Sequence, residues 1–577
     1  MSQDLAELRK RIRHSTSHIM ADVVTSMYPN VKLGIGPPTD DGFYYDFLMD
    51  TPIAQADFEK IEAAMREVMK KDFRFVYKEY PRAEALKLVK DQPLKTEIIN
   101  DLPEGETIST YTHGRFEDLC AGPHIESTGK IPAFKLLNVA GAYWRGDEKR
   151  PMLQRVYGTA YESGEELEAH LKRVAEAERR DHRKLGVELG LFFFNPIAPS
   201  SPFFLPKGAT LYNGHVTYVR DLYKRYGYQE VITPQMFDTE LWKRSGHYAN
   251  YKDNMYFSYV DEKEMGLKPM NCPAAAVLFG SSPHSYRELP IRYADFGRLH
   301  RYERSGVTHG LTRVRTFSQD DAHIFCRQDQ IEQEINSFIA MVNETFNIFG
   351  FKDINVALSL RPDKRIGSDD LWDRAEGALA SALTKQGIRF EPKPGEGAFY
   401  GPKIDFFVND AIGRPWQLST VQLDYNLAER FDLEYNAEDG TRQRPVVVHR
   451  AMLGSLERFL GVMIEHFAGA FPLWLAPVQA VVIPIADRHQ EYANKVAAEL
   501  AQAGIRNEVD SRNERMQAKI RDAQVQKAPY MLVVGDKEAQ AEAAAVRLRS
   551  GENLGAVPVK EIIARMAAEI AEKKPSY

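Results

Sequence analysis

The side chains with the clearest capacity for chemistry lie in two neighbouring segments, residues 296–305 and 313–325. Those that share a face of an expected strand are Arg301 and Glu303 in the first segment, and Phe317, Gln319, Asp321 and His323 in the second. Because side chains alternate along a strand with period two, a face of this composition does not belong to a core. The fork of an arginine can neutralise a phosphate, and an aromatic ring can stack on a base. The pattern indicates a nucleotide site, with a salt-bridged solvent face as the alternative.

A third segment, residues 446–459, combines an apolar strand with the start of a helix. The run VVVH leads to GSLERF, which puts Gly454 at a tight turn and Arg458 in the first helical turns. A helix N-terminus already favours anions, so Arg458 is a candidate phosphate ligand, with a buried salt bridge as the alternative. Residues 224–234 predict a helix end and a strand closed by proline, which alone indicates little.

Histidines and a cysteine near the N-terminus form a separate group. His14 and His18 lie four residues apart on one helix face, and Asp118, Cys120 and His124 follow about a hundred residues later. An HxxxH with a CxxxH is a fair zinc signature, and unrelated surface histidines are the alternative.

Cys272, His323 and His449 are a further possible ligand set, but they lie far apart in the chain. No local spacing typical of metal ligands joins them, so residue type alone favours three satisfied core residues.

Length and composition require several domains around these groups. The 577 residues are too many for one hydrophobic core, and the 44% hydrophobic and 27% charged fractions are ordinary for a soluble globular protein. Three scattered cysteines indicate a reducing cytoplasm, and the polar N-terminus is neither a signal peptide nor a membrane span. With a net charge of −6, RNA binding must use local patches. One candidate patch, which is otherwise a solvated helix face, comprises Arg512, Arg515, Lys519, Arg521 and Lys527.

Three kinds of element are expected to position the candidate residues. Residues 163–186 predict one charged helix, begun by a capping box of Ser163 and Glu166, that suits a connector between domains. Residues near 200–475 predict a large antiparallel sheet with long helices. The last hundred residues alternate buried strands with helices, which predicts a small α/β domain with helices on both sheet faces.

Together and in this order, the segments 224–234, 296–325 and 446–459 resemble motifs 1, 2 and 3 of class II aminoacyl-tRNA synthetases. The wider matches MNCP (residues 270–273), DDAHIF (320–325) and GSLERF (454–459) resemble the threonyl-tRNA synthetases, and the resemblance covers nearly the whole chain. The resemblance implies a multidomain protein of α/β and α+β folds. Its expected domains are an α+β editing domain (1–162), a helical linker (163–190), a class II antiparallel-sheet catalytic core (191–476) and an α/β anticodon-binding domain (477–577). Many members carry a ubiquitin-like domain before the editing domain, whereas this chain starts almost directly at the editing helix.

The resemblance also implies the parts of an adenylation site. Arg301 and Arg458 would be catalytic, with Arg301 on the α-phosphate of ATP, and Mg²⁺ would accompany ATP. The expected ATP ligands are Arg301, Glu303 and Phe317 toward the α-phosphate and adenine, and Arg313 and Arg458 toward the γ-phosphate. Because charge builds on the phosphates during adenylation, preplaced arginines stabilise the transition state.

Cys272, His323 and His449 occupy the positions that hold one zinc ion per chain in this family. Three protein ligands leave zinc an open position for substrate. Binding through the hydroxyl of L-threonine would reject valine, but serine lacks only a methyl group, which is worth roughly 1–3 kcal/mol. A second sieve is therefore expected. The other expected threonine contacts are Asp321, Gln319, Tyr400 and Met270.

The second sieve is expected in the N-terminal domain, which resembles the editing domain of threonyl- and alanyl-tRNA synthetases. There His14, His18, Asp118, Cys120 and His124 would position a seryl-tRNA(Thr) ester and a hydrolytic water, rather than hold a structural zinc. In the last domain, Asn513, Glu538 and Arg547 are candidates for reading anticodon bases.

The resemblance implies tRNA(Thr) as partner, a homodimer built through residues 226–234, no membrane and a cytoplasmic location. Three alternatives remain: a synthetase for serine or proline, a noncatalytic synthetase-like RNA-binding protein, and a free-standing deacylase. The Cys272, His323 and His449 set speaks against the first, intact Arg301 and Arg458 against the second, and the residues beyond 200 against the third.

Overall fold

The computed structural model describes residues 3–304 and 306–574. Residues 1–2, 305 and 575–577, which belong to the expected first, third and fourth domains, lie outside the described residues, and so does the Ser305 end of the segment 296–305. The chain divides into two compact units, Met1–Ala175 and Glu176–Tyr577, and each is described by itself.

The first unit packs two helices against a four-stranded antiparallel sheet of order β1-β2-β7-β6. Its elements are α1 (Gln3–Met27), β1 (Lys32–Leu33), β2 (Phe43–Leu48), α2 (Phe58–Lys70), β3 (Val76–Tyr80), α3 (Arg82–Leu88), α4 (Pro93–Asp101), β4 (Ile108–His113), β5 (Phe116–Leu119), β6 (Ala133–Tyr143) and β7 (Met152–Tyr161). Ile12, Ile19 and Val23 repeat at helical spacing on α1 and are buried with Phe43 and Phe47 of β2. A second sheet, β3-β4-β5, carries Asp118 at its edge.

A charged helix, α5 (Gly164–Arg180), leads from the first unit into the second. The Ser163 hydroxyl accepts the Glu166 N–H at 3.1 Å, which is one of the two hydrogen bonds of the expected capping box. The expected single helix over 163–186 is wrong, because α5 ends at Arg180 and a second helix, α6 (His182–Glu188), begins after one intervening residue. The break arises at Asp181, whose carboxylate accepts the Arg183 N–H at 2.8 Å and caps α6.

The second unit contains the predicted large sheet, of nine strands, with the order β10-β14-β16-β23-β20-β19-β17-β18 and β15 paired to β16. The strands of this part of the second unit, in the large sheet and outside it, are β8 (Phe192–Phe194), β9 (Pro202–Phe204), β10 (Gln229–Glu230), β11 (Met236–Asp238), β12 (Phe257–Val260), β13 (Lys263–Leu267), β14 (Ile291–Asp295), β15 (Arg298–His300), β16 (Thr316–Cys326), β17 (Ile354–Ser359), β18 (Glu391–Lys393), β19 (Lys403–Asn409), β20 (Pro415–Asp424), β21 (Tyr435–Asn436), β22 (Arg442–Gln443) and β23 (Val446–Ser455). Its helices are α7 (Pro206–Tyr226), α8 (Thr239–Arg244), α9 (His247–Tyr251), α10 (Cys272–Phe279), α11 (Ile331–Ile348), α12 (Asp369–Lys385), α13 (Asn426–Arg430) and α14 (Leu456–His466). Within the nine-stranded sheet, neighbouring strands are antiparallel except for two parallel pairs, β10 with β14 and β17 with β18.

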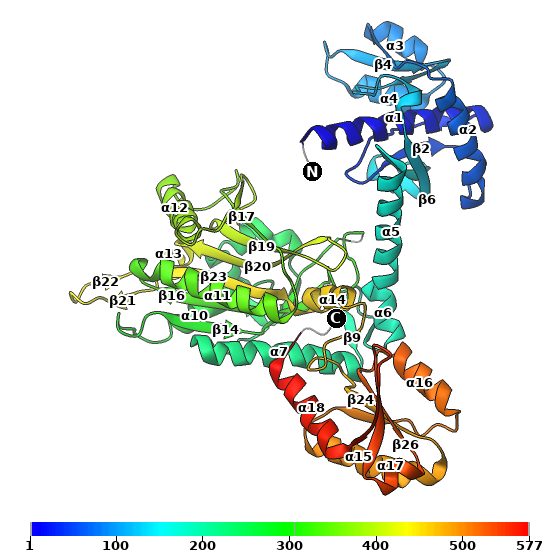
Figure 1. Ribbon diagram of the computed structural model, residues 1–577. Coiled ribbons are helices and arrows are strands. Elements are labelled where there is room, and N and C mark those ends of the chain that lie inside the picture. The colour runs from blue at the N-terminus through cyan, green and yellow to red at the C-terminus, as the bar shows by residue number, and fades with distance from the viewer. Residues whose placement is uncertain (1–2, 305, 575–577) are drawn as a thin grey trace. The chain divides into compact units, whose positions relative to one another are not determined.

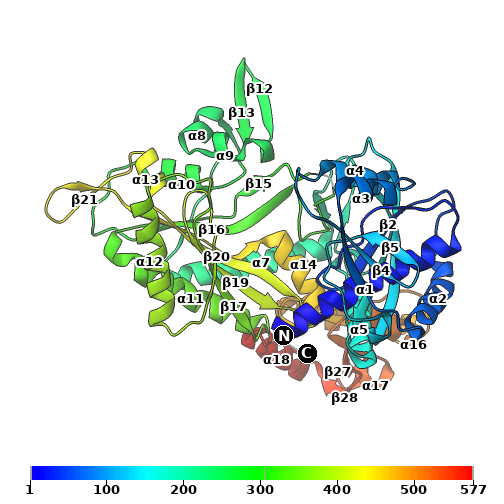
Figure 2. The same ribbon diagram turned by 90° about the horizontal axis from the view of Figure 1, so that it is seen from above.

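The main hydrophobic core lies between this sheet and the helices that pack on it. Helix α11 packs against β20 and β23, and Figure 1 shows it lying along the sheet. Helix α14 follows β23 directly and buries Leu456, Phe459, Leu460 and Met463, the stripe expected at helical spacing. Figure 2 shows the small sheet of β11, β13 and β12, with α8 and α9, projecting beyond the large one.

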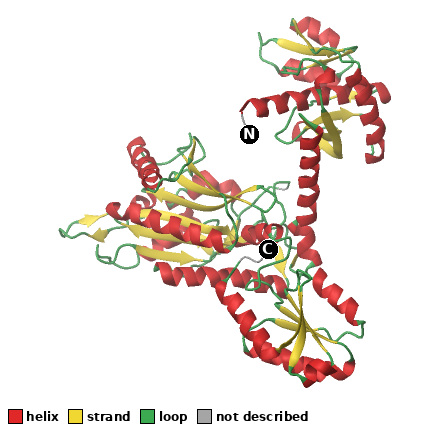
Figure 3. Ribbon diagram, in the orientation of Figure 1, coloured by secondary structure: helices red, strands yellow, loops and turns green. Residues whose placement is uncertain are grey.

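The last part of the second unit is the expected small α/β domain, with a five-stranded sheet of order β25-β24-β26-β27-β28. Its elements are β24 (Ala480–Pro484), α15 (Gln490–Gln502), β25 (Asn507–Val509), α16 (Met516–Val525), β26 (Tyr530–Val534), α17 (Asp536–Gln540), β27 (Ala543–Leu548), β28 (Asn553–Pro558) and α18 (Val559–Glu572). Val482 of β24 is buried with α15 and α18, whereas the next residue, Ile483, is buried with Ile520 of α16. Helices therefore cover both sheet faces, as predicted and as Figure 3 shows.

Candidate functional site

Arg301 lies just beyond β15, with its charge beside an aromatic ring. Leu299 of β15 pairs with Phe317 of β16, and the guanidinium of Arg301 lies 5.0 Å from the centre of the Phe317 ring. Its Nε donates to the carbonyl of Pro269 at 3.1 Å. Within residues 3–304 and 306–574, no carboxylate forms an ion pair with Arg301. A cation held by a carbonyl and a ring, without a counterion, is suited to an anionic ligand.

Two further arginines converge from the motif 2 and motif 3 segments. Arg313 donates through Nε and Nη2 to Oε2 of Glu303, at 3.1 and 3.0 Å. The Nε of Arg458 is buried and has no hydrogen-bond partner among the described residues. Burial lowers the pKa of Arg458, and the charge of Arg313 lowers it further. Because both effects disfavour its positive charge, an anion bound between Arg313 and Arg458 would be stabilised strongly.

Asp320 fixes the relation between the two central strands. A bulge interrupts the pairing of β16 with β23 between Gln319 and Asp321, and it turns the Asp320 carboxylate toward the end of β23. That carboxylate accepts the backbone N–H groups of Met452, Leu453 and Gly454 at 2.9 to 3.0 Å. The bulge therefore anchors the turn that precedes Arg458 of α14.

Cys272, His323 and His449 come together although they are distant in sequence. His323 of β16 and His449 of β23 are direct cross-strand partners, and Cys272 is the first residue of α10. The three ligand atoms lie within 4.8 Å of one another, and all three residues are buried. Nε2 of His323 and Nδ1 of His449 have no hydrogen-bond partner among the described residues.

The electrostatics of this cluster fit a metal ion. Burial raises the pKa of the Cys272 thiol, but the His449 and His323 imidazoles lower it more, to about 7, which favours the thiolate. Nε2 of His449 pairs with Oδ2 of Asp424 at 3.0 Å. A carboxylate behind a histidine orients it as a metal ligand, so a thiolate and two imidazoles with unpaired nitrogens fit zinc. Sequence reasoning missed Asp424, because nothing in the end of β20 distinguishes it from a turn residue.

The four residues expected to contact threonine differ in how closely they are connected to this cluster. Oδ2 of Asp321 accepts from Nδ2 of Asn271 at 3.1 Å, and the Tyr400 ring lies 5.1 Å from that of His449. Met270, two residues before Cys272, contacts Nε2 of His247 through its sulfur at 3.1 Å. Gln319 is half-buried on β16 and forms no hydrogen bond with Asp321, Tyr400 or Met270 in the described part of the chain.

In the first unit, His14, His18, Cys120 and His124 form one cluster, and the first three of them line a cavity of about 480 Å³. The Cys120 sulfur lies 3.3 Å from Nε2 of His14 and 3.2 Å from Nε2 of His124. Burial, together with the charges of His14 and His113, lowers the pKa of His124 to about 2. Burial also raises the pKa of the Cys120 thiol to about 12. At neutral pH this set is uncharged, unlike the Cys272 cluster.

Asp118 lines the same cavity, with two neighbours that sequence reasoning missed. Nζ of Lys95, on α4, lies 2.8 Å from Oδ1 and 2.9 Å from Oδ2 of Asp118, and the Tyr45 hydroxyl of β2 donates to the same carboxylate. Lys95 is only 3% exposed, so its ammonium is held at the cavity wall. Neither residue stands in a motif, and only the fold brings α4 and β2 to Asp118.

The anticodon candidates lie on three separate elements of the last domain. Asn513 is exposed before α16, Glu538 lies on α17 and accepts the Gly535 N–H at 3.0 Å, and Arg547 lies on β27. No hydrogen bond or ion pair joins these three within the described ranges.

The expected basic patch is smaller than its sequence suggested. Arg512 pairs with Asp510 and Asp522 at 2.6 and 2.9 Å. Lys519 is buried and donates to the carbonyls of Pro484 and Asp510. Arg515 and Arg521 remain exposed and Lys527 is half-buried, so part of the run is structural.

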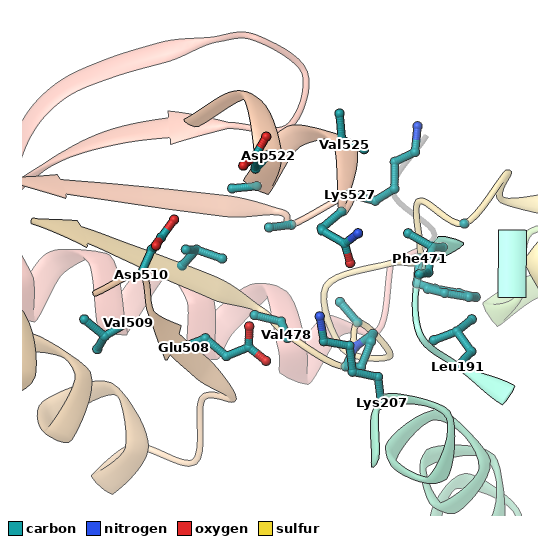
Figure 4. Close-up of a pocket in the computed structure, with 18 of the residues that line it drawn as sticks. Leu191, Lys207, Phe471, Val478, Glu508, Val509, Asp510, Asp522, Val525 and Lys527 are labelled. Atoms are coloured by element: carbon teal, nitrogen blue, oxygen red, sulfur yellow. The ribbon is translucent and has the colours of Figure 1, made fainter. Parts of the chain in front are cut away.

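The most voluminous cavity described, about 830 Å³, lies away from all the predicted catalytic residues. Leu191, Lys207 and Phe471 line one side, and residues 508–512, 522–523 and 525–528 of the last domain line the other (Figure 4). Asp510 and Asp522 pair with Arg512, and none of the described residues that line the cavity belongs to the predicted catalytic set.

Three family models match this chain. The tRNA synthetase class II core domain (G, H, P, S and T) matches residues 256–467, and the anticodon binding domain matches residues 479–569. The second additional domain of threonyl and alanyl tRNA synthetases matches residues 108–157.

Curated relatives and solved structures agree with these matches. The threonine–tRNA ligase of Acetivibrio thermocellus is 50% identical over 568 residues, which are 98% of this chain and 89% of the relative. That of Clostridium tetani is 52% identical over 569 residues, with the same coverage. The RNA binding domain of threonyl-tRNA synthetase from Cryptosporidium parvum has a TM-score of 0.66 and 44% identity, over 67% of this chain and 98% of that one. Within the described residues, no helix is long and apolar enough to span a membrane.

Proposed function

We propose a division of chemistry among the residues of this chain from the premise that it belongs to the threonyl-tRNA synthetase family. It is a threonine–tRNA ligase with a class II catalytic core, an anticodon-binding domain and an editing domain that supports deacylation of mischarged tRNA. ATP and tRNA are its substrates, and Mg²⁺ accompanies ATP. The observation that supports the residue assignments best is that Cys272, at the start of α10, meets His323 of β16 and His449 of β23, while β16 also pairs with β15, the strand that Arg301 directly follows.

In the activation step, the threonine carboxylate attacks the α-phosphorus of ATP, and pyrophosphate leaves. We assign Arg301 to the α-phosphate, because its charge has no carboxylate partner among the residues that the structure describes. Arg313 and Arg458 would take the γ-phosphate, which relieves their repulsion. Phe317 and Glu303 would hold adenine, and this requires Glu303 to share or release Arg313. Cations preplaced in this way stabilise the charge that develops on the leaving pyrophosphate.

Cys272, His323 and His449 would hold one zinc ion, with Asp424 orienting His449. When bound, zinc supplies an open coordination position for the amino group and hydroxyl of threonine. Asp321 can accept from the same threonine groups, and Tyr400 and Met270 lie beside the cluster. Valine has no hydroxyl and is rejected, whereas serine is admitted because its missing methyl group is worth only about 1–3 kcal/mol.

Hydrolysis of seryl-tRNA(Thr) would take place in the first unit. His14, His18 and His124 have lowered pKa values, so they are neutral at pH 7 and can position a water. His124, whose pKa is about 2, is too weak a base to take the proton of that water, so His14 and His18 would accept it. The Lys95 ammonium beside Asp118 offers positive charge near the developing oxyanion. Asn513, Glu538 and Arg547 remain our candidates for anticodon recognition.

Pyrophosphate exchange with threonine, serine and valine in parallel tests the activation site. We expect strong exchange with threonine, weaker exchange with serine and almost none with valine. Elemental analysis should find one zinc per chain, lost or weakened in Cys272→Ala. Valine exchange equal to that of threonine, or protein that activates threonine fully without zinc, would contradict the zinc assignment.

We also propose a cytoplasmic homodimer formed through residues 226–234. Ile232 is 90% exposed, and β10 pairs only with β14 at the sheet edge, so this segment has both an apolar side chain and backbone groups to offer a second copy. Sedimentation should show a dimer that Ile232→Glu dissociates and that Val525→Glu, a substitution at another exposed apolar residue, leaves intact. A fully active monomer at micromolar concentration would contradict the proposal.

A further inference from the structure

A buried histidine outside the expected sites lies where α6 meets α14. His182 is 0% exposed, and its Nδ1 lies 2.6 Å from Oε1 of Glu465. The backbone N–H of His182 donates to the same oxygen at 3.1 Å. Asp181, next to it, caps α6 and pairs with Arg183. The start of α6 is thereby tied to the last turn of the motif 3 helix.

The second ring nitrogen of His182 holds the motif 2 loop. Nε2 lies 2.9 Å from the backbone nitrogen of Leu311. A backbone N–H can only donate, so Nε2 must be the unprotonated acceptor and the ring proton must lie on Nδ1. That proton is then donated to Glu465, whose pKa is lowered, because His182 and Arg414 outweigh its burial. Both ring nitrogens are engaged, so this Asp181, His182 and Glu465 group has no histidine ligand to offer a metal ion.

The loop at Leu311 packs closely against His182 and α14, so its backbone has little space to move. Gly310 has φ +48°, and a Cβ at this position would lie 2.1 Å from Nε2 of His182. A Cβ at Gly461 of α14 would lie 3.2 Å from Cβ of Leu311. Leu311 itself is 0% exposed and belongs to the main core. The loop is therefore held between α6 and α14. Glycine is required at position 310 for this close approach, and position 461 leaves little space for a larger residue.

The hydrogen bond from the Leu311 N–H to His182, which we call the clamp, lies two residues before Arg313. The backbone N–H of His309 donates to the Arg313 carbonyl at 3.0 Å, which closes the loop around Leu311. We propose that His182 is a positioning residue for ATP binding: by accepting the Leu311 N–H it holds the motif 2 loop so that Arg313 faces Arg458. The inference rests on the proposed contact of Arg313 with ATP. It assigns a role in the adenylation site to α6, which lies far from motif 2 in sequence.

Two substitutions at His182 separate its two hydrogen bonds. The amide of asparagine replaces Nδ1 and keeps the bond to Glu465, whereas the amide of glutamine reaches the place of Nε2 and keeps an acceptor for Leu311. We expect His182→Asn to raise the KM for ATP in pyrophosphate exchange by about fivefold or more, the effect of one lost hydrogen bond. His182→Gln should keep the KM for ATP within about twofold of the parent, even if its melting temperature falls. The KM for threonine should change little in either variant.

Gly310→Ala tests the same clamp from the loop side, without altering His182. It should raise the KM for ATP as His182→Asn does. His215→Asn, at a buried histidine of α7 that bonds to the Leu211 carbonyl, controls for the loss of a core imidazole. It should lower the melting temperature and leave the KM for ATP unchanged.

Arg313→Ala distinguishes failure of the proposed function from failure of this inference. An unchanged KM for ATP in Arg313→Ala overturns the ATP contact of Arg313 and, with it, the reason for the clamp. A raised KM in Arg313→Ala, together with an unchanged KM in His182→Asn and Gly310→Ala, overturns the positioning role of His182 alone. Equal increases in His182→Asn and His182→Gln that follow the loss of melting temperature also overturn it, since they indicate a structural role.

Discussion

Arg301 and Arg292 lie in the same part of the large sheet, yet their surroundings differ. Arg301 contacts the Pro269 carbonyl and the Phe317 ring, without a carboxylate partner in the described chain. Arg292 of β14 donates through Nε and Nη2 to the buried carboxylate of Glu334, at 2.6 Å each. Arg301, which we assign to substrate binding, can therefore be compared directly with Arg292, which forms a structural ion pair.

We predict that Arg301→Ala abolishes threonine-dependent pyrophosphate exchange and leaves the fold intact. The rate should fall by about a hundredfold to a thousandfold, because one preplaced charge on the transition state is lost. The free energy of unfolding should change by less than about 1 kcal/mol. Arg292→Ala should do the reverse: its unfolding free energy should fall by about 3–5 kcal/mol, because Glu334 is left buried and unpaired. An unfolded Arg301→Ala would favour the salt-bridge alternative.

We expect the clustered histidines of the first unit to make its stability depend on pH, because their pKa values are lowered. His124 has a pKa lowered to about 2, chiefly through burial, whereas a histidine in an unfolded chain titrates near about 6.5. Because the unfolded state binds the proton more readily, the stability from His124 is complete above about pH 6.5 and decreases as the pH falls. Each such histidine contributes a slope of about 1.4 kcal/mol per pH unit below that value.

We predict that His124→Gln reduces this slope by the contribution of one histidine. The measurement is the unfolding free energy of α1 by hydrogen exchange at several pH values between 5 and 7.5, in the parent and the variant. The stability difference between them should shrink as the pH falls. Parallel curves would show that His124 is protonated in the folded protein.

At the residue scale, sequence reasoning predicted side chains whose motif is local and missed those that the fold recruits. Arg301, Phe317 and Arg458 stand in recognisable segments, and in the structure the Arg301 guanidinium lies beside the Phe317 ring. Asp424, Lys95 and His182 stand in ordinary strand ends or helices, and each acts through a neighbour distant in sequence. Their burial and their partners are properties of the tertiary fold, which residue spacing does not specify.

At the element scale, the β16–β23 pair depends on one carboxylate. Asp320 accepts three backbone N–H groups and lies 3.6 Å from Arg450, and both side chains are 0% exposed. Burial raises the pKa of Asp320 to about 7, although Arg450 and the backbone donors oppose this. The carboxylate thus connects the bulge in β16 to the turn before α14.

We predict that Asp320→Ala lowers the unfolding free energy of the second unit by about 3–5 kcal/mol, because it leaves Arg450 buried without its partner. Asp329→Ala is the matched control: Asp329 lies just after β16, 68% exposed, and pairs with Arg327 at the surface. Its effect should not exceed about 1 kcal/mol. Urea unfolding followed by tryptophan fluorescence measures both. Equal effects would mean that the strand register does not depend on Asp320.

Regular elements could be predicted from the sequence, but their interruptions could not. Alternation indicated the antiparallel sheet, and helical spacing indicated the buried stripe of α14. The bulge at Asp320 and the break between α5 and α6 leave no mark on periodicity. Asp181 is one polar residue within a polar helix, and only its bond to Arg183 shows that a new helix begins there.

At the scale of the whole molecule, two chemistries belong to two compact units. The residues that we assign to adenylation and to zinc binding all lie in Glu176–Tyr577, and those that we assign to editing all lie in Met1–Ala175. A site that binds the threonine hydroxyl cannot reject serine strongly, because serine lacks only a methyl group. Accuracy therefore requires a second step on charged tRNA, at a site that admits serine and excludes the additional methyl group of threonine.

We predict that His14→Ala/His18→Ala leaves threonine activation nearly unchanged while seryl-tRNA(Thr) accumulates. The two imidazoles face the cavity from α1, and His14 is in contact with Cys120. Both have lowered pKa values, so they are the uncharged form that can accept a proton from water near pH 7. Their loss should slow deacylation of preformed seryl-tRNA(Thr) by about a hundredfold or more. His170→Ala, at a buried histidine of α5 that packs on Tyr161 outside the cavity, is the control and should deacylate like the parent. Equal deacylation by parent and double variant would mean that the histidines are structural, whereas a parallel loss of threonine activation would mean that the two units do not act independently.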